Sequence, residues 1–364
     1  MWDGPAGLDD MKNDTKSLDI TLICGLRGSG KTTLARALSG GAMGDPVVAD
    51  WAPGHGVDEA DSSPEFALEL AEHLCGLADN GMTGRVVIEL NPAVDALEAV
   101  LVLEAVLTAR EPSANVTVLR EVVVTVTAAD IRSYFFSEEM PDPADYETGE
   151  ALSRQIEIAT AVVISGGDRV SRRELSEVVA LIQKLNPLAR VQSSAPQFTL
   201  GALRRVSPDA SPPSGQGMGW MLELAGRAGP ARTVAGISTV VFRDPRPFHP
   251  GRLAEVVEHC LGPDTVGTIL RSRGLTRLAS RPDTVGGWAS TGRVLALEAT
   301  SMSSWDPDSP LGQELVFVGL NLRTDALCRV LGAALVDGDE LIAGPMEWAT
   351  YTDHFPEWDT DHQH

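Results

Sequence analysis

Residues 25–32 read Gly-Leu-Arg-Gly-Ser-Gly-Lys-Thr and match the pattern GxxxxGK[ST] of a phosphate-binding loop. The apolar run Asp19–Cys24 before the loop predicts a buried strand, and Lys31–Leu38 after it predicts a helix. Glycines let backbone N–H groups curl around an anion, and a helix N-terminus favours negative charge. The order strand, loop, helix therefore predicts a nucleotide site, the alternative being a loop that keeps its shape without binding.

Each side chain of this loop has an expected role. Lys31 is expected to reach the β- and γ-phosphates, and the Thr32 hydroxyl to bind the Mg²⁺ that accompanies the nucleotide. The predicted nucleotide-binding residues of the loop are Gly25, Gly28, Ser29, Gly30, Lys31, Thr32 and Thr33.

Strands and helices alternate over residues 19–205, which we expect to form the nucleotide-binding domain. Further strands are predicted at Pro46–Asp50, Arg85–Leu90, Glu121–Thr127, Ala159–Ser165 and Arg190–Ser193. Further helices are predicted at Pro64–Leu77, Val94–Leu107 and Arg172–Leu185. Alternation of this kind predicts an α/β fold, a parallel sheet with helices on its flanks. Residues 1–18 are expected to be a flexible leader.

The composition changes at Ser207–Gly219, where Pro, Ser and Gly dominate, so we expect a linker or exposed loop over residues 206–236. Strands are then predicted at Thr239–Phe242, Leu275–Ala279, Val294–Glu298 and Leu315–Val318, and helices at Pro250–Cys260 and Asp325–Leu335. This pattern predicts a small α+β domain with an antiparallel sheet over residues 237–350, followed by an acidic tail over residues 351–364.

The chain of 364 residues has a formal net charge of −22. Such a charge repels nucleic acid and argues against direct DNA binding. Neither Lys nor Arg occurs from Ala37 to Gly84, or after Arg329, and eight acids follow from Val336 onward. These segments serve solubility alone, or they face a cation or a basic protein partner.

No apolar run approaches the roughly 18 residues of a membrane span. The polar, acidic N-terminus lacks the apolar core of a signal peptide, so we expect a cytoplasmic protein. The cysteines are far apart in sequence and form no CxxC pair, so we interpret them as core thiols: Cys24, Cys75, Cys260 and Cys328.

Several longer segments resemble the CobW-like family of P-loop GTPases, often described as metallochaperones. They are the stretch GLRGSGKTTL, Gln155–Ala159, Leu185–Ala189, Arg246–Pro250, Leu270–Gly274 (similar to a family turn) and Gln313–Gly319. The resemblance runs from about Thr21 to Trp358. It implies a P-loop domain, a CobW-type C-terminal domain, and GTP or another nucleotide with Mg²⁺.

Three departures from the family are visible. The family's CxCC metal motif is missing, because Cys75 is the only cysteine between Ala42 and Arg85, and one thiolate cannot build a tetrahedral zinc site. No zinc site is therefore expected; harder ligands would be Asp50, His55, Asp58 and Asp61, whose spacing is unspecific.

The other two departures affect the nucleotide. The family's NKxD motif is reduced to Ser165-Gly166-Gly167-Asp168, so Asp168 alone is expected to read the base, which leaves GTP against ATP open. Glu89, the candidate catalytic residue, would hold Mg²⁺ through water or position a hydrolytic water. Pro92 stands where the family senses the γ-phosphate and has no N–H. We expect at most a weak GTPase.

The tail carries His354, His362 and His364 with Asp353, Asp359 and Asp361, which form a metal-binding tail or are simply solvated. Its aromatic residues pack the tail onto the protein or enter a partner's groove: Trp348, Tyr351, Phe355 and Trp358.

The second domain and tail most resemble an actinobacterial branch of the family, produced in zinc limitation, some of whose members bring a hibernation factor to the ribosome. The resemblance implies a nucleotide-binding adaptor that contacts a hibernation factor or ribosomal protein. The alternative is a GTP-dependent zinc or cobalt metallochaperone. A kinase acting on a small molecule is a third, less favoured class.

Overall fold

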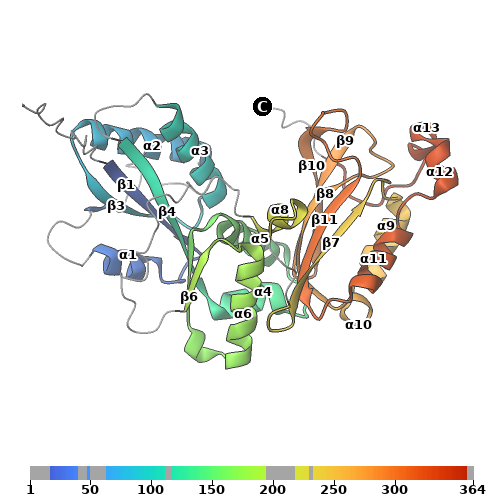
Figure 1. Cartoon of the computed structure of the whole chain (residues 1–364), viewed down its shortest axis with the longest axis horizontal. Helices are drawn as coiled ribbons and strands as arrows, with labels where there is room; N and C mark the ends of the chain where they lie inside the picture. The colour runs from blue at the N-terminus through green and yellow to red at the C-terminus, as the bar shows by residue number, and fades with distance from the viewer. Residues whose placement is uncertain are drawn as a thin grey trace, which may run out of the picture.

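The computed structural model describes residues 17–39, 47–49, 63–110, 116–193, 218–228 and 233–358. Within these residues the chain forms two sheets, one parallel and one antiparallel, which lie side by side (Figure 1). Helices α5 (Pro143–Ile158) and α8 (Gly219–Leu224) lie between them. No helix of the described part is long and apolar enough to cross a membrane.

The first sheet has six parallel strands in the order β2-β3-β1-β4-β5-β6. The strands are β1 (Ser17–Gly25), β2 (Val47–Ala49), β3 (Gly84–Glu89), β4 (Val116–Thr127), β5 (Ala161–Ser165) and β6 (Arg190–Ser193). The helices of this part are α1 (Lys31–Ser39), α2 (Ser63–Asp79), α3 (Ala96–Ala109), α4 (Ala128–Phe136), α5 and α6 (Arg172–Leu185). The predicted α/β fold with a parallel sheet is confirmed.

Strand β1 is the centre of this sheet and pairs with β3 on one side and β4 on the other. Leu18, Ile20, Leu22 and Ile23 are all completely buried, as expected for a strand covered on both faces. The chain first builds the β2 and β3 side and then crosses to β4. Ligands of such sheets bind where the strand order reverses, outside the carboxyl ends of β1 and β4.

Helices α4 and α5 were not predicted from the sequence. For α5 the reason is its buried side, which includes Glu150, Ser153, Gln155 and Glu157 besides its apolar residues. Polar side chains at buried positions hide the apolar periodicity on which a helix prediction depends.

The second sheet is antiparallel, in the order β10-β9-β8-β11-β7. Its strands are β7 (Ile237–Asp244), β8 (Thr268–Thr276), β9 (Thr284–Thr291), β10 (Val294–Ser303) and β11 (Gln313–Leu320). The helices are α9 (Pro250–His259), α10 (Pro263–Val266), α11 (Thr324–Ala333), α12 (Gly338–Ala343) and α13 (Pro345–Trp348). Trp288 packs against Phe248 and Phe317 in its core. The predicted small α+β domain is confirmed.

Three local expectations for this part were wrong. Leu270–Gly274, which resembled a turn, lies inside β8, and β9 was missed. The predicted strand Leu275–Ala279 ends at Thr276, after which Leu278 bridges to Phe248. Buried polar side chains in β8 and β9, such as Arg271 and Ser290, interrupt the apolar pattern.

Two segment boundaries also differ from expectation. The expected leader reaches residue 18, but β1 begins at Ser17, and residues 1–16 lie outside the described part. The expected linker contains α8, whose Gly219 packs tightly against α6: a Cβ there would lie 2.0 Å from the carbonyl oxygen of Lys184. This end of the linker is therefore packed structure rather than exposed loop.

The tail folds back onto the second domain. Trp348 Nε1 donates to the Glu340 carbonyl at 2.7 Å, and Tyr351 stacks on His249 with ring centroids 4.5 Å apart. Phe355 and Trp358 pack against the second core, and the Arg281 guanidinium lies over Trp358. The expectation that these aromatic residues pack the tail onto the protein is confirmed.

The tail's predicted metal-binding residues are only partly described. Asp353 accepts from Ser280 Oγ at 2.6 Å and Arg281 Nε at 2.8 Å, so its carboxylate holds the tail in place. His354 is exposed, and the other four lie outside the described residues: Asp359, Asp361, His362 and His364.

A buried cluster of charges joins the two domains, and we call it the interdomain ion-pair cluster: Arg271 and Arg273 of β8 with Glu150 and Glu157 of α5. Arg271 is fully buried, and its guanidinium donates to Glu150, to Glu157 at 3.3 Å and to Thr291 Oγ1 at 2.9 Å. Arg273 donates to Glu150 at 2.9 Å. Burial would raise the pKa of Glu150, but the Arg271 and Arg273 charges outweigh it and lower that pKa to about 2. Glu150 is therefore ionised at neutral pH.

Candidate functional site

The phosphate loop lies between β1 and α1, as predicted. Gly28 and Gly30 have φ values of 81° and 104°, which favour glycine, and a Cβ at either would meet nothing within 4 Å. The first N–H groups of α1 have no acceptor within the helix. The loop is thus open on the side where these donors point, as phosphate binding requires.

Gly25 has a different role, at the end of β1. Its φ is 143°, and a Cβ would lie 2.4 Å from the backbone oxygen of Thr125 in β4. The absence of a side chain allows β1 and β4 to approach each other where the loop begins.

Lys31 is buried at the base of the loop. Its Nζ donates to the carbonyl oxygens of Gly25 at 2.8 Å and Leu26 at 3.0 Å. Burial lowers the pKa of Lys31, and the nearby Glu89 carboxylate partly offsets this effect. The ammonium group is held across the loop, where bound phosphate oxygens would stabilise its charge.

Thr32 and Glu89 form a pair of hard oxygen ligands beside the loop. Thr32 Oγ1 donates to Glu89 Oε1 at 2.9 Å, which joins the start of α1 to the end of β3. A hydroxyl and a carboxylate suit Mg²⁺ when nucleotide phosphates supply the remaining oxygens. Pro92 is exposed in the turn that follows β3.

A cavity of about 460 Å³ extends from the loop to the carboxyl end of β5. It is lined by Gly28, Ser29, Gly30, Thr33, Leu34, Ala37, Thr125, Thr127, Ala129, Val163, Ser165, Gly166, Asp168 and Arg169. Asp168 is exposed in the short 3₁₀ turn Gly167–Arg169, which follows Gly166 in the left-handed region at φ 66°. The cavity therefore connects the phosphate loop to the residue expected to read the base.

Hydroxyl groups from β4 and β5 position the loop against this cavity. Ser29 Oγ and Thr125 Oγ1 are 2.7 Å apart, and Ser165 Oγ donates to the Ser29 carbonyl at 3.2 Å. Five further lining residues were not predicted from the sequence: Thr125, Thr127, Ala129, Val163 and Arg169. The signal that could have found them is polar residues at the carboxyl ends of two apolar strands.

The predicted site residues come together around the loop. Gly28, Ser29, Gly30, Thr33 and Asp168 line the cavity, while Gly25 and Lys31 shape the loop itself. Thr32 and Glu89 contact each other at its edge.

The metal-ligand candidates are not brought together in the described part of the chain. No group of three His, Cys, Asp or Glu side chains there is arranged to hold a metal ion. Asp50, His55, Asp58 and Asp61 lie outside that part.

All four cysteines are free. Cys24 is buried in the first core, and Cys260 and Cys328 pack against the second, as expected for core thiols, whereas Cys75 is half-buried. Burial raises the pKa of the Cys24 thiol to about 12, so it is not a thiolate ligand.

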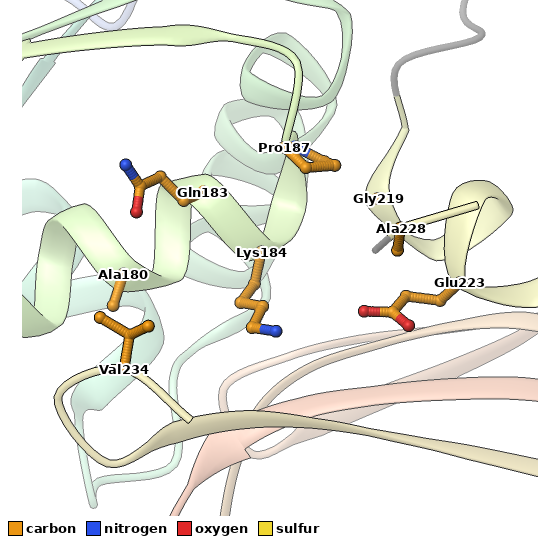
Figure 2. A pocket seen from close by; sticks show the side chains of 8 residues that line it. All are labelled: Ala180, Gln183, Lys184, Pro187, Gly219, Glu223, Ala228 and Val234. Carbon is orange, nitrogen blue, oxygen red and sulfur yellow. The ribbon is translucent and has the colours of Figure 1, made fainter. Parts of the chain in front are cut away.

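A second, smaller cavity lies between α6 and α8 (Figure 2). It has about 160 Å³ and is lined by Ala180, Gln183, Lys184 and Pro187 from one side and Gly219, Glu223, Ala228 and Val234 from the other. Figure 2 shows the charged ends of Lys184 and Glu223 directed toward the gap between α6 and α8. Ligand pockets usually have about 300 Å³ or more, so this cavity does not suit a nucleotide.

A phosphate loop on a doubly wound parallel sheet, with its cavity at the carboxyl ends of the strands, defines a P-loop protein. The domain family described as "Cobalamin synthesis protein cobW C-terminal domain" matches residues 237–335. The second domain therefore matches the CobW C-terminal domain family, and the resemblance of the chain to CobW-like P-loop GTPases is supported.

Two curated relatives have names that refer to zinc. "Zinc-regulated GTPase metalloprotein activator 1" of Dictyostelium discoideum is 26% identical over 227 residues, 56% of this chain and 47% of that protein. "Zinc chaperone Rv0106" of Mycobacterium tuberculosis (strain ATCC 25618 / H37Rv) is 28% identical over 250 residues, 62% of this chain and 58% of that protein. The chain spans about half the length of these relatives.

Among solved structures, the Zn(II)-bound YjiA GTPase from E. coli is similar to this chain. It is 16% identical, the match covers 88% of this chain and 99% of that one, and the TM-score is 0.37.

Proposed function

We propose that this protein binds a guanine nucleotide with Mg²⁺ and uses it as a switch in zinc handling. The observation that carries the proposal is the phosphate loop, with Lys31 and the Thr32–Glu89 pair, opening into a cavity that reaches Asp168. A volume of about 460 Å³ suits a small-molecule ligand. The zinc part is supported by the names of the two relatives, which favour the metallochaperone alternative over the adaptor.

Each residue has a defined part in this proposal. The loop's N–H groups and Lys31 bind the phosphates, and Thr32 with Glu89 holds Mg²⁺. The Asp168 carboxylate accepts from the N1 and N2 hydrogens of guanine, a donor pair that adenine does not present. Gly166 and Gly167 provide no long side chain to pack along the base, so we expect a smaller preference for guanine than an NKxD motif gives.

Hydrolysis is expected to be slow. Phosphoryl transfer depends on positioned donors around the γ-phosphate, and Pro92 offers no N–H at the place where the family has its sensor. Glu89 can orient a water but also binds Thr32. The nucleotide then acts mainly through its bound state, as in a slow switch.

Lys31→Ala tests the nucleotide site. Labelled GTP should bind about 10- to 150-fold more weakly, because hydrogen bonds to a charged group contribute about 1.5–3 kcal/mol. Lys184→Ala is the matched control, because Lys184 lies in α6 and does not line the cavity at the phosphate loop. This variant should bind GTP as the unchanged protein does. Equal GTP affinities in the unchanged protein, Lys31→Ala and Lys184→Ala would contradict the proposal.

Asp168→Asn tests the reading of the base. In competition with ATP, this variant should show a smaller preference for GTP than the unchanged protein.

A second function is favoured by the surface of the second domain, which is acidic and carries exposed apolar side chains. As an adaptor of the zinc-limitation response, the protein would bring a basic hibernation factor to the ribosome. Ribosomes pelleted from zinc-depleted cells should then contain this protein together with such a factor. Pellets that contain neither would contradict the adaptor, and GTP binding would be unaffected by that result.

A further inference from the structure

We propose that helices α12 and α13 form a docking surface for a basic segment of a partner protein that also carries apolar side chains. We call it the α12–α13 surface: Leu341, Ile342 and Met346, with the acidic residues Asp337, Asp339 and Glu347 around them. The inference deepens the proposed function, since a nucleotide switch has to act on a partner, but it rests on different residues.

The apolar residues of this surface are exposed. Ile342 is 85% exposed, Met346 91% and Leu341 45%. A helix of a soluble protein normally turns its apolar side toward the core. None of the residues of α12 or α13 is buried, and these two helices contact each other at the outer end of the second domain (Figure 1).

The side of α12 that faces the protein is polar. Glu340 binds Arg252 of α9 through two hydrogen bonds of 2.9 and 2.5 Å, and its carbonyl accepts from Trp348. Asp337 and Glu340 also form a capping box at the start of α12. The apolar residues are thus not needed to hold these helices in place, which leaves them free for a partner.

The anchoring also makes the surface rigid before it binds. The hydrogen bonds of Arg252 lower the pKa of Glu340 to about 2, so the ion pair is intact throughout the physiological range. Gly344, at φ 77°, makes the turn between the two helices. A preorganised surface loses little entropy when a partner binds.

Charge selects the kind of partner. From residue 330 to residue 358 the sequence has six acids and neither Lys nor Arg. Two of the acids, Glu340 and Asp353, are paired with arginines. The remaining four are exposed: Asp337, Asp339, Glu347 and Glu357.

An acidic rim around apolar side chains fits a segment in which Lys or Arg flank apolar residues. The same charge disfavours nucleic acid, an anionic membrane and a second copy of this surface.

The probe is a synthetic helical peptide of Leu and Lys, compared with a matched peptide in which Glu replaces Lys. The full-length protein should bind the Lys peptide and not the Glu peptide, more weakly as salt increases. The double variant Ile342→Ser/Met346→Ser keeps the net charge and should bind at least tenfold more weakly, since it removes the apolar area that both side chains would bury against the peptide. Because the net charge of this double variant is unchanged, its weaker binding distinguishes docking on the α12–α13 surface from general attraction to an acidic protein.

Leu188→Ser/Leu311→Ser is the matched control, because these leucines are 67% and 87% exposed elsewhere on the surface. Equal peptide affinity in the two double variants overturns the proposal. Residues 203–205 read Leu-Arg-Arg, so a segment of the chain itself has the required chemistry. Stronger peptide binding by Arg204→Ser/Arg205→Ser would show that this segment occupies the surface and would overturn a partner. Lys31→Ala should bind the peptide normally, so failure of the nucleotide site and of docking are separable.

Discussion

Gly25→Ala is expected to lower the free energy of unfolding by about 3 kcal/mol or more and to abolish nucleotide binding. The added Cβ would lie 2.4 Å from the Thr125 carbonyl oxygen and 2.6 Å from Ser29 Oγ. The backbone of β4 cannot move aside without breaking its pairing to β1, which continues to Gly25 itself. Alanine at φ 143° is strained in addition. Urea denaturation followed by circular dichroism measures the stability.

Gly76→Ala is the control for this substitution. Gly76 lies within α2, and a Cβ there would meet nothing within 4 Å. Alanine should stabilise the helix by about 0.5–1 kcal/mol, because glycine loses more entropy on folding. If the two variants shift the urea midpoint alike, the close approach of β1 and β4 at Gly25 has no energetic weight.

Arg271→Ala is expected to lower the free energy of unfolding by about 3–5 kcal/mol. The substitution leaves Glu150 and Glu157 buried, with Arg271's hydrogen bonds lost. Arg273 still binds Glu150, so the larger part of the loss comes from Glu157 and the emptied volume. The thermal midpoint and the urea midpoint should both fall.

Two controls separate this charge effect from loss of an arginine in general. Arg329→Ala, at an exposed position of α11, should change stability by less than about 0.5 kcal/mol. The triple variant Arg271→Met/Glu150→Leu/Glu157→Leu should recover most of the loss, since a buried ion pair can be replaced by apolar residues of similar volume. A loss in Arg271→Ala no larger than in Arg329→Ala would refute the prediction.

The pH dependence provides a second readout of the cluster. The folded-state pKa of Glu150, about 2, lies below its ordinary value of 4.5. A lowered carboxylate pKa stabilises the folded state above the ordinary value, and this contribution is lost as the pH falls toward the folded-state value. The unchanged protein should therefore lose stability between about pH 4.5 and pH 2 more steeply than the triple variant does.

The phosphate loop could be predicted from the sequence because its determinants are local. The strand before it, the glycines and the helix after it are adjacent in the chain, and each is visible in residue type alone. The predicted helix Arg172–Leu185 has the observed bounds of α6, and the structure shows a determinant that is also local: Ser171 and Glu174 form a capping box at its start.

The wall of the cavity could not be predicted in the same way. Thr125 and Ser165 become part of the site only because β4 and β5 lie beside β1 and end at the same edge of the sheet. That neighbourhood depends on the strand order, which no local pattern specifies. Asp168 could therefore be predicted through its resemblance to a motif, whereas the hydroxyl groups that position the loop could not.

The interdomain ion-pair cluster was missed for a related reason. Arg271 and Glu150 are 121 residues apart, and in the sequence both look like ordinary surface charges. Arginine and glutamate are almost never fully buried unless they are paired, so residue type favours exposure. Their pairing also explains why α5 and β8 were not recognised as elements, since both have charged residues at buried positions.

The interdomain ion-pair cluster also restricts how the two domains can be recombined. Because a fully buried arginine in one domain meets glutamates in the other, each domain depends on charges that the other supplies. A recombinant that joins this nucleotide domain to a second domain without an arginine at the position of Arg271 would inherit two glutamates without their counterion. Any new pairing of these two domains therefore has to keep both halves of the ion pair, although each half lies outside the phosphate site.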